Sequence, residues 1–225
     1  MMTTENLSEF LRYLAAHKQD EGNLPALTDL SQELGISVAS LREQLEVARA
    51  LGLVDVRPRT GIRRLPYRFL PAIRQSLGYA MALEKANFQL FADLRKHVEV
   101  SYWHEAVKKL TGEDLLHLKA LMERAWSKLD GRPIQIPHDE HKQLHLTIYG
   151  QLNNPFVNGI LEAYWEAYEA IGLNVFNEYN HLREVWQYHE KMVAAICSGN
   201  FDAGYQALIE HTDMLGDLLE HPEKP

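Results

Sequence analysis

Residues 24–61, LPALTDLSQELGISVASLREQLEVARALGLVDVRPRTG, decide the fold of the N-terminal part of this chain. Two short stretches with helical spacing of apolar residues are separated only by the tripeptide GIS, which leaves room for no more than a tight corner. Thr28 is expected to cap the first helix, and Ser37 is expected to cap the second, over residues 38–50. Two short helices joined in this way are typical of a helix-turn-helix.

A short β-hairpin is expected directly after the second helix. LVDVR alternates apolar and polar residues, PRTG has the composition of a turn, and IRRL can return as the second strand. An amphipathic stretch over residues 4–18 predicts one more helix at the start of the chain. Together these elements predict a winged helix-turn-helix domain over residues 1–70, with the hairpin as its small two-stranded β wing.

The charge of the chain is distributed unevenly. The formal net charge is −8, but residues 36–74 contain eight arginines and three acidic residues, while residues 75–225 contain 13 basic and 22 acidic residues. A basic segment in an acidic chain indicates a local anionic partner. A solvated arginine surface is the alternative interpretation.

Composition limits the class of protein. A single cysteine, Cys197, allows neither an intrachain disulfide nor a zinc site built from thiolates, and fits a reducing cytosol. The polar, acidic N-terminus MMTTENLSEF does not have the pattern of a signal peptide, and the longest uncharged run, residues 146–161, is too polar for a membrane span. We therefore expect a cytoplasmic protein without a membrane partner.

The stretch 24–61 resembles the signature of the GntR family of bacterial transcription regulators. The resemblance implies that the second helix lies in the major groove of a double-stranded DNA operator, with the wing beside it. Thr28 and Val38 stand where the family commonly has arginine, so the family's usual operator sequence is not carried over. The residues expected at the DNA are Thr28, Ser37, Ser40, Arg42, Arg57, Arg59 and Arg63.

The remainder of the chain, residues 71–225, is helical in pattern throughout and predicts an antiparallel bundle of about six helices. Residues 71–110 are expected to form one or two long helices. TGEDLLHLKALMERAWSKLDG begins with a threonine cap and ends at a glycine. Further helices are expected over about 137–151, 155–171, 181–197 and 201–220.

Four histidines of this bundle are expected to converge. His141 and His145, in the stretch HDEHKQLH, lie one helical turn apart on one face. His189 and His211 lie almost equally far from the turn at Gly199, about 16 Å at about 1.5 Å per residue, so in an antiparallel hairpin they are at the same height. Helical bundles build metal sites from such inward-facing side chains. The alternative is that each is an ordinary hydrogen-bonded core histidine.

HKQLHLTIYGQLNNPFV and HEKMVAAICSGNFDAGYQALIEH resemble the FCD effector domain of the FadR subgroup of GntR regulators, over roughly residues 75–220. In that domain an aspartate and three histidines bind a divalent metal. His145, His189 and His211 match the three histidines, and His141 stands at the position of the aspartate. Either His141 is the fourth ligand, which we favour, or nearby Asp139 or Glu140 replaces it.

The resemblance also implies a small carboxylate as effector. Arg95 matches an arginine that the family points toward the effector, although an ion pair with Glu99 on the same helix explains it equally well. Tyr149 is a candidate polar group of the pocket. Four imidazoles would suit Zn²⁺, Ni²⁺, Co²⁺ or Cu²⁺ better than Mn²⁺, Mg²⁺ or Ca²⁺, and we expect Zn²⁺ or Ni²⁺.

The predicted protein is thus a homodimeric, non-enzymatic transcription regulator, mainly α in fold, whose operator affinity is controlled by a small carboxylate at a His-rich metal site. Two alternatives remain open. One is a metalloenzyme that uses the His-rich site to activate water, and the other is a direct metal sensor, for which the ion itself is the signal.

Overall fold

The computed structural model describes residues 6–17, 23–57, 61–171 and 179–220 of the chain. The chain divides into two compact units, residues 1–75 and 76–225. Three complete helices, the start of a fourth and a two-stranded sheet form the described part of the first unit, and helices form the described part of the second. The predicted fold class is therefore confirmed, and each unit is described by itself below.

The first unit contains the helix-turn-helix. Its helices are α1 (Glu9–Ala16), α2 (Leu27–Leu34) and α3 (Val38–Ala50). Gly35 ends α2 in the left-handed region, at φ 66°, which a glycine adopts without steric cost. The Ser37 hydroxyl accepts a hydrogen bond from the Ser40 N–H at 3.1 Å and caps α3, as predicted.

The prediction that Thr28 caps the first helix of the helix-turn-helix is wrong. The chain becomes helical directly after Ala26, which occupies the N-cap position with an extended backbone (φ −62°, ψ 153°) and makes no side-chain cap. Thr28 therefore lies inside α2, where its hydroxyl donates to the Asp29 carboxylate at 3.3 Å. The side chain of Thr28 remains exposed on the surface of the unit.

Apolar residues from all three helices and the sheet share one core in the first unit. The fully buried members from the helices are Phe10, Leu30, Leu41 and Ala48, and the strands add Val54 and Ile62. Burial of these side chains fixes α2 and α3 against α1. It also leaves one face of α3, including Arg42, exposed.

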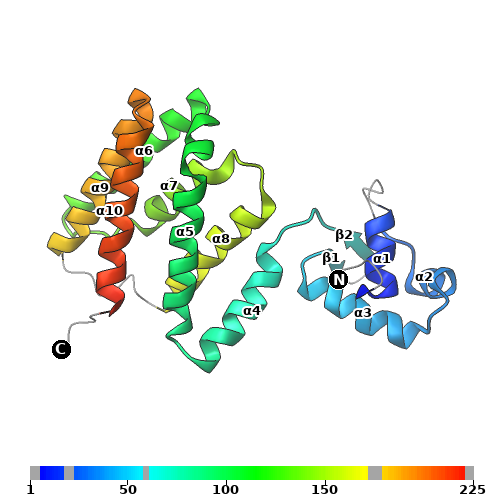
Figure 1. Ribbon diagram of the computed structural model, residues 1–225. Helices are drawn as coiled ribbons and strands as arrows, with labels where there is room; N and C mark the ends of the chain where they lie inside the picture. Colours follow the sequence, from blue (N-terminus) through cyan, green and yellow to red (C-terminus); the bar gives the residue numbers. More distant parts are fainter. Residues whose placement is uncertain (1–5, 18–22, 58–60, 172–178, 221–225) are drawn as a thin grey trace. The chain divides into compact units, whose positions relative to one another are not determined.

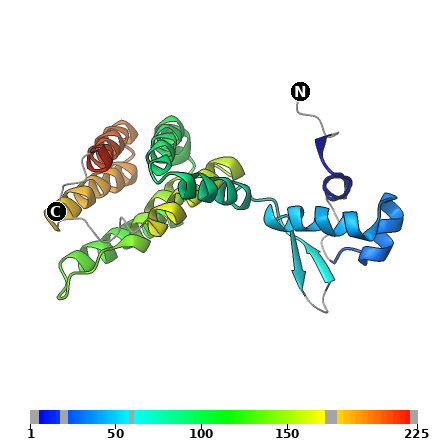
Figure 2. The ribbon, with the colours of Figure 1, turned by 90° about the horizontal axis from the view of Figure 1, so that it is seen from below.

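The predicted wing is an antiparallel hairpin of β1 (Val54–Arg57) and β2 (Gly61–Arg64), in the register Val54↔Arg64 to Arg57↔Gly61. Figure 2 shows the two strands running side by side away from the three helices. Arg64 at the base of β2 donates hydrogen bonds to the carbonyl oxygens of Leu14 and His17 at the end of α1. This arginine therefore attaches the wing to the helical core.

The second unit is the helical bundle, and α4 (Leu70–Leu83) begins in the first unit and ends in the second. The expected long segment after Pro71 is two helices, because α4 ends at Leu83 and the next begins at Asn87. From Leu70 on, the described residues form seven helices where about six were expected. The other six are α5 (Asn87–Lys108), α6 (Gly112–Leu129), α7 (His138–Gly150), α8 (Pro155–Ala170), α9 (Tyr179–Ser198) and α10 (Phe201–Glu220).

The arrangement of the bundle brings α7, α9 and α10 toward one interior. Figure 1 shows α9 and α10 side by side, joined by the short turn at Gly199, with α10 also packed against α5. Helix α6 packs against α7 and α9, and α7 packs against α5 and α8. The core includes Trp103, Leu118, Leu144, Ile148, Trp186 and Leu208. Among the described residues, none of the helices combines the length and the apolar character that crossing a membrane requires.

Gly204→Ala is expected to lower the free energy of unfolding of the bundle by about 1–3 kcal/mol. A Cβ at Gly204 of α10 would lie 2.6 Å from Cζ2 of Trp103, which is fully buried on α5. The indole cannot swing away easily, because its Nε1 donates to the Phe201 carbonyl at 2.9 Å. Urea unfolding followed by circular dichroism measures the change.

Gly78→Ala is the matched control. A Cβ at Gly78, inside α4, has no heavy atom within 4 Å, so this variant is expected to be neutral or up to about 1 kcal/mol more stable through its helix propensity. Equal effects of the two substitutions would show that the close approach of α10 to Trp103 is unimportant.

Candidate metal centre

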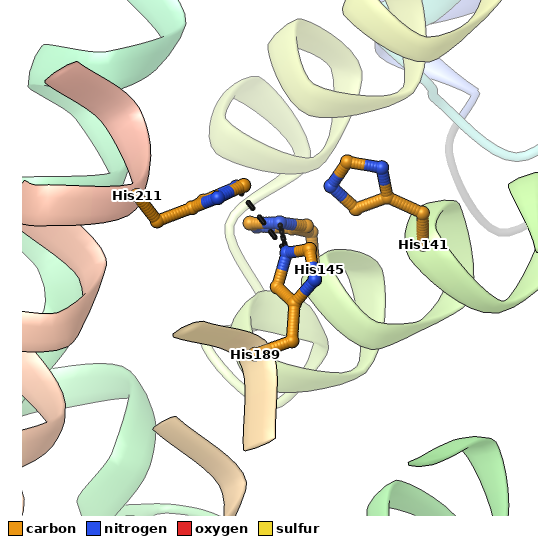
Figure 3. A group of neighbouring side chains, drawn as sticks. All are labelled: His141, His145, His189 and His211. Atoms are coloured by element: carbon orange, nitrogen blue, oxygen red, sulfur yellow. Dashed lines mark hydrogen bonds between the residues drawn. The ribbon is translucent and has the colours of Figure 1, made fainter. Parts of the chain in front are cut away.

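Four histidines from three helices lie together in the interior of the bundle. His141 and His145 come from α7, His189 comes from α9, and His211 comes from α10. His145, His189 and His211 are fully buried, and His141 is 8% exposed. Each side chain offers one ring nitrogen, and these atoms all lie within 4.8 Å of one another (Figure 3). We call this group the four-histidine cluster.

The ring nitrogens of the cluster face a common point. Nε2 of His189 lies 3.3 Å from Nε2 of His145 and 3.2 Å from Nε2 of His211. The ring centroid of His141 lies 4.5 Å from that of His189. The convergence expected from the equal distances of His189 and His211 to the Gly199 turn is therefore present.

These separations fit a transition metal ion. Zn–N bonds of about 2.0–2.1 Å in a tetrahedron place neighbouring nitrogens about 3.3 Å apart. Nε2 of His141 is buried and has no hydrogen-bond partner among the described residues. An unpaired buried acceptor costs about 1–3 kcal/mol, which a metal bond would offset. The cluster could thus hold an ion through four nitrogens.

The protonation states favour metal binding. Burial lowers the pKa of His141 and of His189 well below the ordinary histidine value, and the neighbouring imidazoles and the Arg95 charge lower it further. Burial also lowers the pKa of His145. Neutral imidazoles keep a lone pair for a metal at neutral pH, so binding does not have to displace a second proton from these rings.

A buried ion pair adjoins the cluster on α5. Nε of Arg95 lies 2.8 Å from Oε2 of Glu99, with both side chains almost fully buried. Burial raises the pKa of Glu99, but the charge of Arg95 and the hydrogen bonds from His145 and Arg95 outweigh that effect and the pKa is lowered, so Glu99 is a carboxylate. The ion pair, given above as an alternative role for Arg95, is present.

His145 connects this ion pair to the cluster. Its Nδ1 lies 3.0 Å from Oε1 of Glu99 and 2.9 Å from Nη2 of Arg95, while its Nε2 faces His189. Carboxylates in this position commonly orient a metal-binding histidine. The sequence suggested Glu99 only as a partner of Arg95. The signal for a link to His145 is weak, since 46 residues separate the two positions.

Tyr149, the other expected effector contact, is fully buried on α7. Its hydroxyl donates a hydrogen bond to the main-chain carbonyl oxygen of Glu99 at 2.9 Å, which joins α7 to α5. Burial and the Glu99 charge raise its pKa well above the ordinary tyrosine value, so the hydroxyl keeps its proton. In this structure Tyr149 therefore supports the frame around Arg95 and Glu99.

The acidic alternatives for the fourth ligand are not part of the cluster. Glu140 is buried, but its carboxylate pairs with Lys128 at 2.7 Å and with Arg124 at 3.8 Å. Asp139 is not in the group of converging donors either. His141 is the fourth member of the cluster, and its ring contacts those of Trp165 and Trp186, with centroid distances of 4.6 and 5.9 Å.

The candidate DNA contacts lie on the first unit, and most of them are exposed. Arg42 on α3 and Arg63 on β2 are exposed, as are Thr28 and Ser37, while Ser40 is half-buried. Arg57 is exposed and pairs with Asp55 at 2.7 Å. Arg59 lies outside the described residues.

Comparison with known proteins shows the family to which the chain belongs. Residues 91–214 match the model of the FCD domain, which is more than half of the chain. The chain belongs to the FCD family of GntR transcription regulators. The match includes all four histidines of the cluster as well as Arg95 and Glu99.

Similar proteins agree with this family. The HTH-type transcriptional regulator LutR of Bacillus subtilis is 23% identical over 202 residues, which is 87% of this chain and 90% of LutR. The fatty acid metabolism regulator protein of Haemophilus influenzae is 25% identical over 199 residues, 84% of this chain and 77% of that protein. A solved GntR structure from Streptococcus agalactiae superposes with a TM-score of 0.68 at 16% identity, over 92% of this chain and 95% of the other. These relatives are transcription regulators and not enzymes, which is the class predicted for this FCD protein.

Proposed function

We propose that this FCD protein is a cytoplasmic, homodimeric regulator whose affinity for a DNA operator is controlled by a small carboxylate bound at a metal ion in the four-histidine cluster. In this proposal residues 1–70 read the DNA, and residues 71–225 hold the ion and the effector. His141, His145, His189 and His211 hold the ion, which we expect to be Zn²⁺ or Ni²⁺. Arg95 and Tyr149 are the candidate effector contacts.

The observation that carries the proposal is the convergence of four buried imidazoles with no carboxylate among them. An ion held by neutral nitrogens keeps its full charge of +2, and the Arg95–Glu99 pair adds no net charge. A buried, uncompensated cation attracts an anion, which fits a carboxylate effector. Nitrogen donors also favour Zn²⁺ or Ni²⁺ over Mn²⁺ and Mg²⁺.

The first unit supports the DNA-binding half of the proposal. The exposed face of α3 and the wing present arginines of the kind that contact phosphates and guanine edges. A dimer would place two such helices in successive major grooves, about 34 Å apart. Exposed apolar side chains on α4 and α5 offer a surface for pairing of two chains: Tyr79, Leu83, Leu90 and Leu94.

The experiment selects operator sequences from random double-stranded DNA with the Zn²⁺-loaded protein and then titrates a panel of small carboxylates by fluorescence anisotropy. We expect at least one carboxylate to change the DNA affinity, and only when the ion is present. A change with the ion alone and with no carboxylate would instead favour a direct metal sensor, which the all-nitrogen donor set makes credible. Failure to select any sequence would refute the proposal.

Arg42→Ala and Arg63→Ala are expected to affect DNA binding differently. Arg42 on α3 should read a base edge, so its loss should cost about 1–3 kcal/mol and relax the base preference at one position. Arg63 on the wing should contact a phosphate, so its loss should weaken binding to all DNA sequences alike. It should also reduce the salt slope, which is the slope of the logarithm of the binding constant against the logarithm of the salt concentration, by about 1. Anisotropy titrations at several salt concentrations measure both.

Lys109→Ala is the control for these variants. Lys109 is exposed in the second unit and pairs with Glu105 at 2.7 Å, so its loss removes the same charge far from the reading helix in sequence. We expect no change in base preference or salt slope. An equal loss in all three variants would mean that only the net charge of the protein matters.

A further inference from the structure

Nδ1 of His145 lies within hydrogen-bond distance of one group that can only accept a hydrogen bond and of another that can only donate one. Oε1 of Glu99 lies 3.0 Å away and can only accept a hydrogen bond, because the carboxylate is ionised. Nη2 of Arg95 lies 2.9 Å away and can only donate one. A single imidazole nitrogen either carries a hydrogen and donates to Glu99, or is bare and accepts from Arg95.

Occupancy of the other ring nitrogen decides between these two arrangements. Nε2 of His145 faces the centre of the four-histidine cluster, so an ion there would use that atom. A neutral imidazole bonded to a metal through Nε2 carries its hydrogen on Nδ1. The hydrogen on Nδ1 then points to Glu99, and Nη2 of Arg95 loses its acceptor on His145.

Arg95 cannot adapt by losing a proton, since a guanidinium stays charged in proteins. Its Nε makes an ion pair with Glu99 at 2.8 Å, but this contact lacks hydrogen-bond alignment. The guanidinium lies over the ring of Tyr164, 4.7 Å from the centroid, and the side chain is almost fully buried. With an ion in the cluster, a buried Arg95 donor therefore needs a new acceptor.

We propose that Glu99 is a positioning residue that couples ion binding to anion binding: it fixes Nδ1–H of His145 toward itself when Nε2 holds the ion, and so releases an Arg95 donor for the incoming anion. The inference rests on the metal site of the proposed function and deepens it. By linkage, the anion must strengthen ion binding by the same factor as the ion strengthens anion binding. Direct ligation of the anion to the ion gives coupling too, but that part does not depend on Glu99 or Arg95.

The test uses Co²⁺, whose visible spectrum reports its ligands, and acetate as the anion, with the full-length protein. Affinity for Co²⁺ is measured by competition with a chelator, with and without acetate. Glu99→Gln keeps an acceptor but removes the charge, and is expected to weaken Co²⁺ binding about 10–100-fold with an unchanged four-nitrogen spectrum. Arg95→Gln is expected to keep Co²⁺ binding and to lower the factor by which acetate strengthens it.

Two further variants keep the test decisive. The double variant Arg95→Gln/Glu99→Gln removes both charges of the buried pair, a change that proteins often tolerate. We expect it to bind Co²⁺ as weakly as the Glu99→Gln variant does, and we expect acetate to strengthen that binding by a smaller factor than in the wild type. Glu140→Gln alters another buried, ion-paired glutamate on α7 and should leave Co²⁺ affinity and acetate coupling at their wild-type values.

The outcomes separate the inference from the function on which it rests. Wild-type Co²⁺ affinity in Glu99→Gln, or undiminished acetate coupling in Arg95→Gln, overturns the role of the Arg95–Glu99 pair and leaves the metal site standing. Absence of Co²⁺ binding by the wild-type protein overturns the metal site itself. An equal loss in Glu140→Gln would assign the effect to general destabilisation of α7.

Discussion

His189→Gln is expected to remove tight transition-metal binding from the protein. Nε2 of His189 lies close to two other ring nitrogens of the cluster, 3.3 Å from that of His145 and 3.2 Å from that of His211. Glutamine has a similar volume, so packing changes little, but it offers no imidazole nitrogen. The loss in affinity should exceed the roughly 10–100-fold that removal of an outer partner of a ligand costs.

Competition with a chelator measures the affinity for Zn²⁺ and Ni²⁺, and elemental analysis measures the bound metal. Thermal unfolding gives an independent reading. An ion that binds only the folded state adds about 2.7 kcal/mol at a concentration of 100 times its dissociation constant. Wild-type protein should gain this stability from Zn²⁺, and the His189→Gln variant should gain little or none at the same concentration.

His104→Gln is the matched control, because it changes a histidine of the same unit outside the cluster. His104 is partly exposed and pairs with Asp202 at 3.0 Å, and its loss should leave metal binding intact. Wild-type metal content and affinity in His189→Gln would mean that the four histidines are ordinary core residues, which was the alternative interpretation of the sequence.

The four-histidine cluster illustrates what a sequence can predict. His141 and His145 are neighbours through helical periodicity, and His189 and His211 are neighbours through their equal distance from one short turn. Both relations depend on sequence spacing and on a regular helix, so no tertiary contact had to be known. The expectation that both pairs face the interior of one helical bundle related them to each other, the resemblance to the FCD domain agreed with it, and the structure brings the four ring nitrogens within 4.8 Å of one another.

The wrong cap of α2 and the contact of Glu99 with His145 illustrate what the spacing of residues in the sequence cannot predict. Thr28 is a good capping residue, but the chain becomes helical after Ala26, because Leu27 and Leu30 then pack against the core of the first unit. The contact between Glu99 and His145 depends on how α5 packs against α7, and the sequence gives no rule for which side chains meet there. Local rules therefore predicted the four histidines of the cluster, while the contacts of the charged residues beside them required the tertiary structure.

His141→Asp is expected to change which metal the protein prefers. The substitution replaces a nitrogen donor with a carboxylate, which is a harder ligand and suits Mn²⁺ and Mg²⁺ better than imidazole does. We expect the ratio of Ni²⁺ to Mn²⁺ affinities to fall by at least about 10-fold. Competition titrations of the two ions against one chelator give this ratio.

The charge of the new side chain leads to a second expected result. A carboxylate at position 141 would be buried among imidazoles and against the ring of Trp165, an environment that disfavours an unpaired charge. Without metal, the variant should therefore be less stable than the wild type, and it should gain more stability from an ion. With metal, the carboxylate offsets one of the two charges of the ion, so acetate should bind more weakly than it does to the wild-type site.

His141→Asn separates these two effects, because it supplies an oxygen donor of the same size without the charge. If donor hardness decides metal choice, Asn should shift the ratio of Ni²⁺ to Mn²⁺ affinities in the same direction as Asp while leaving acetate affinity near the wild-type value. If the charge decides, only Asp should shift either quantity. An unchanged ratio in both variants would place position 141 outside the coordination shell, and the ion would then be held by His145, His189 and His211 alone.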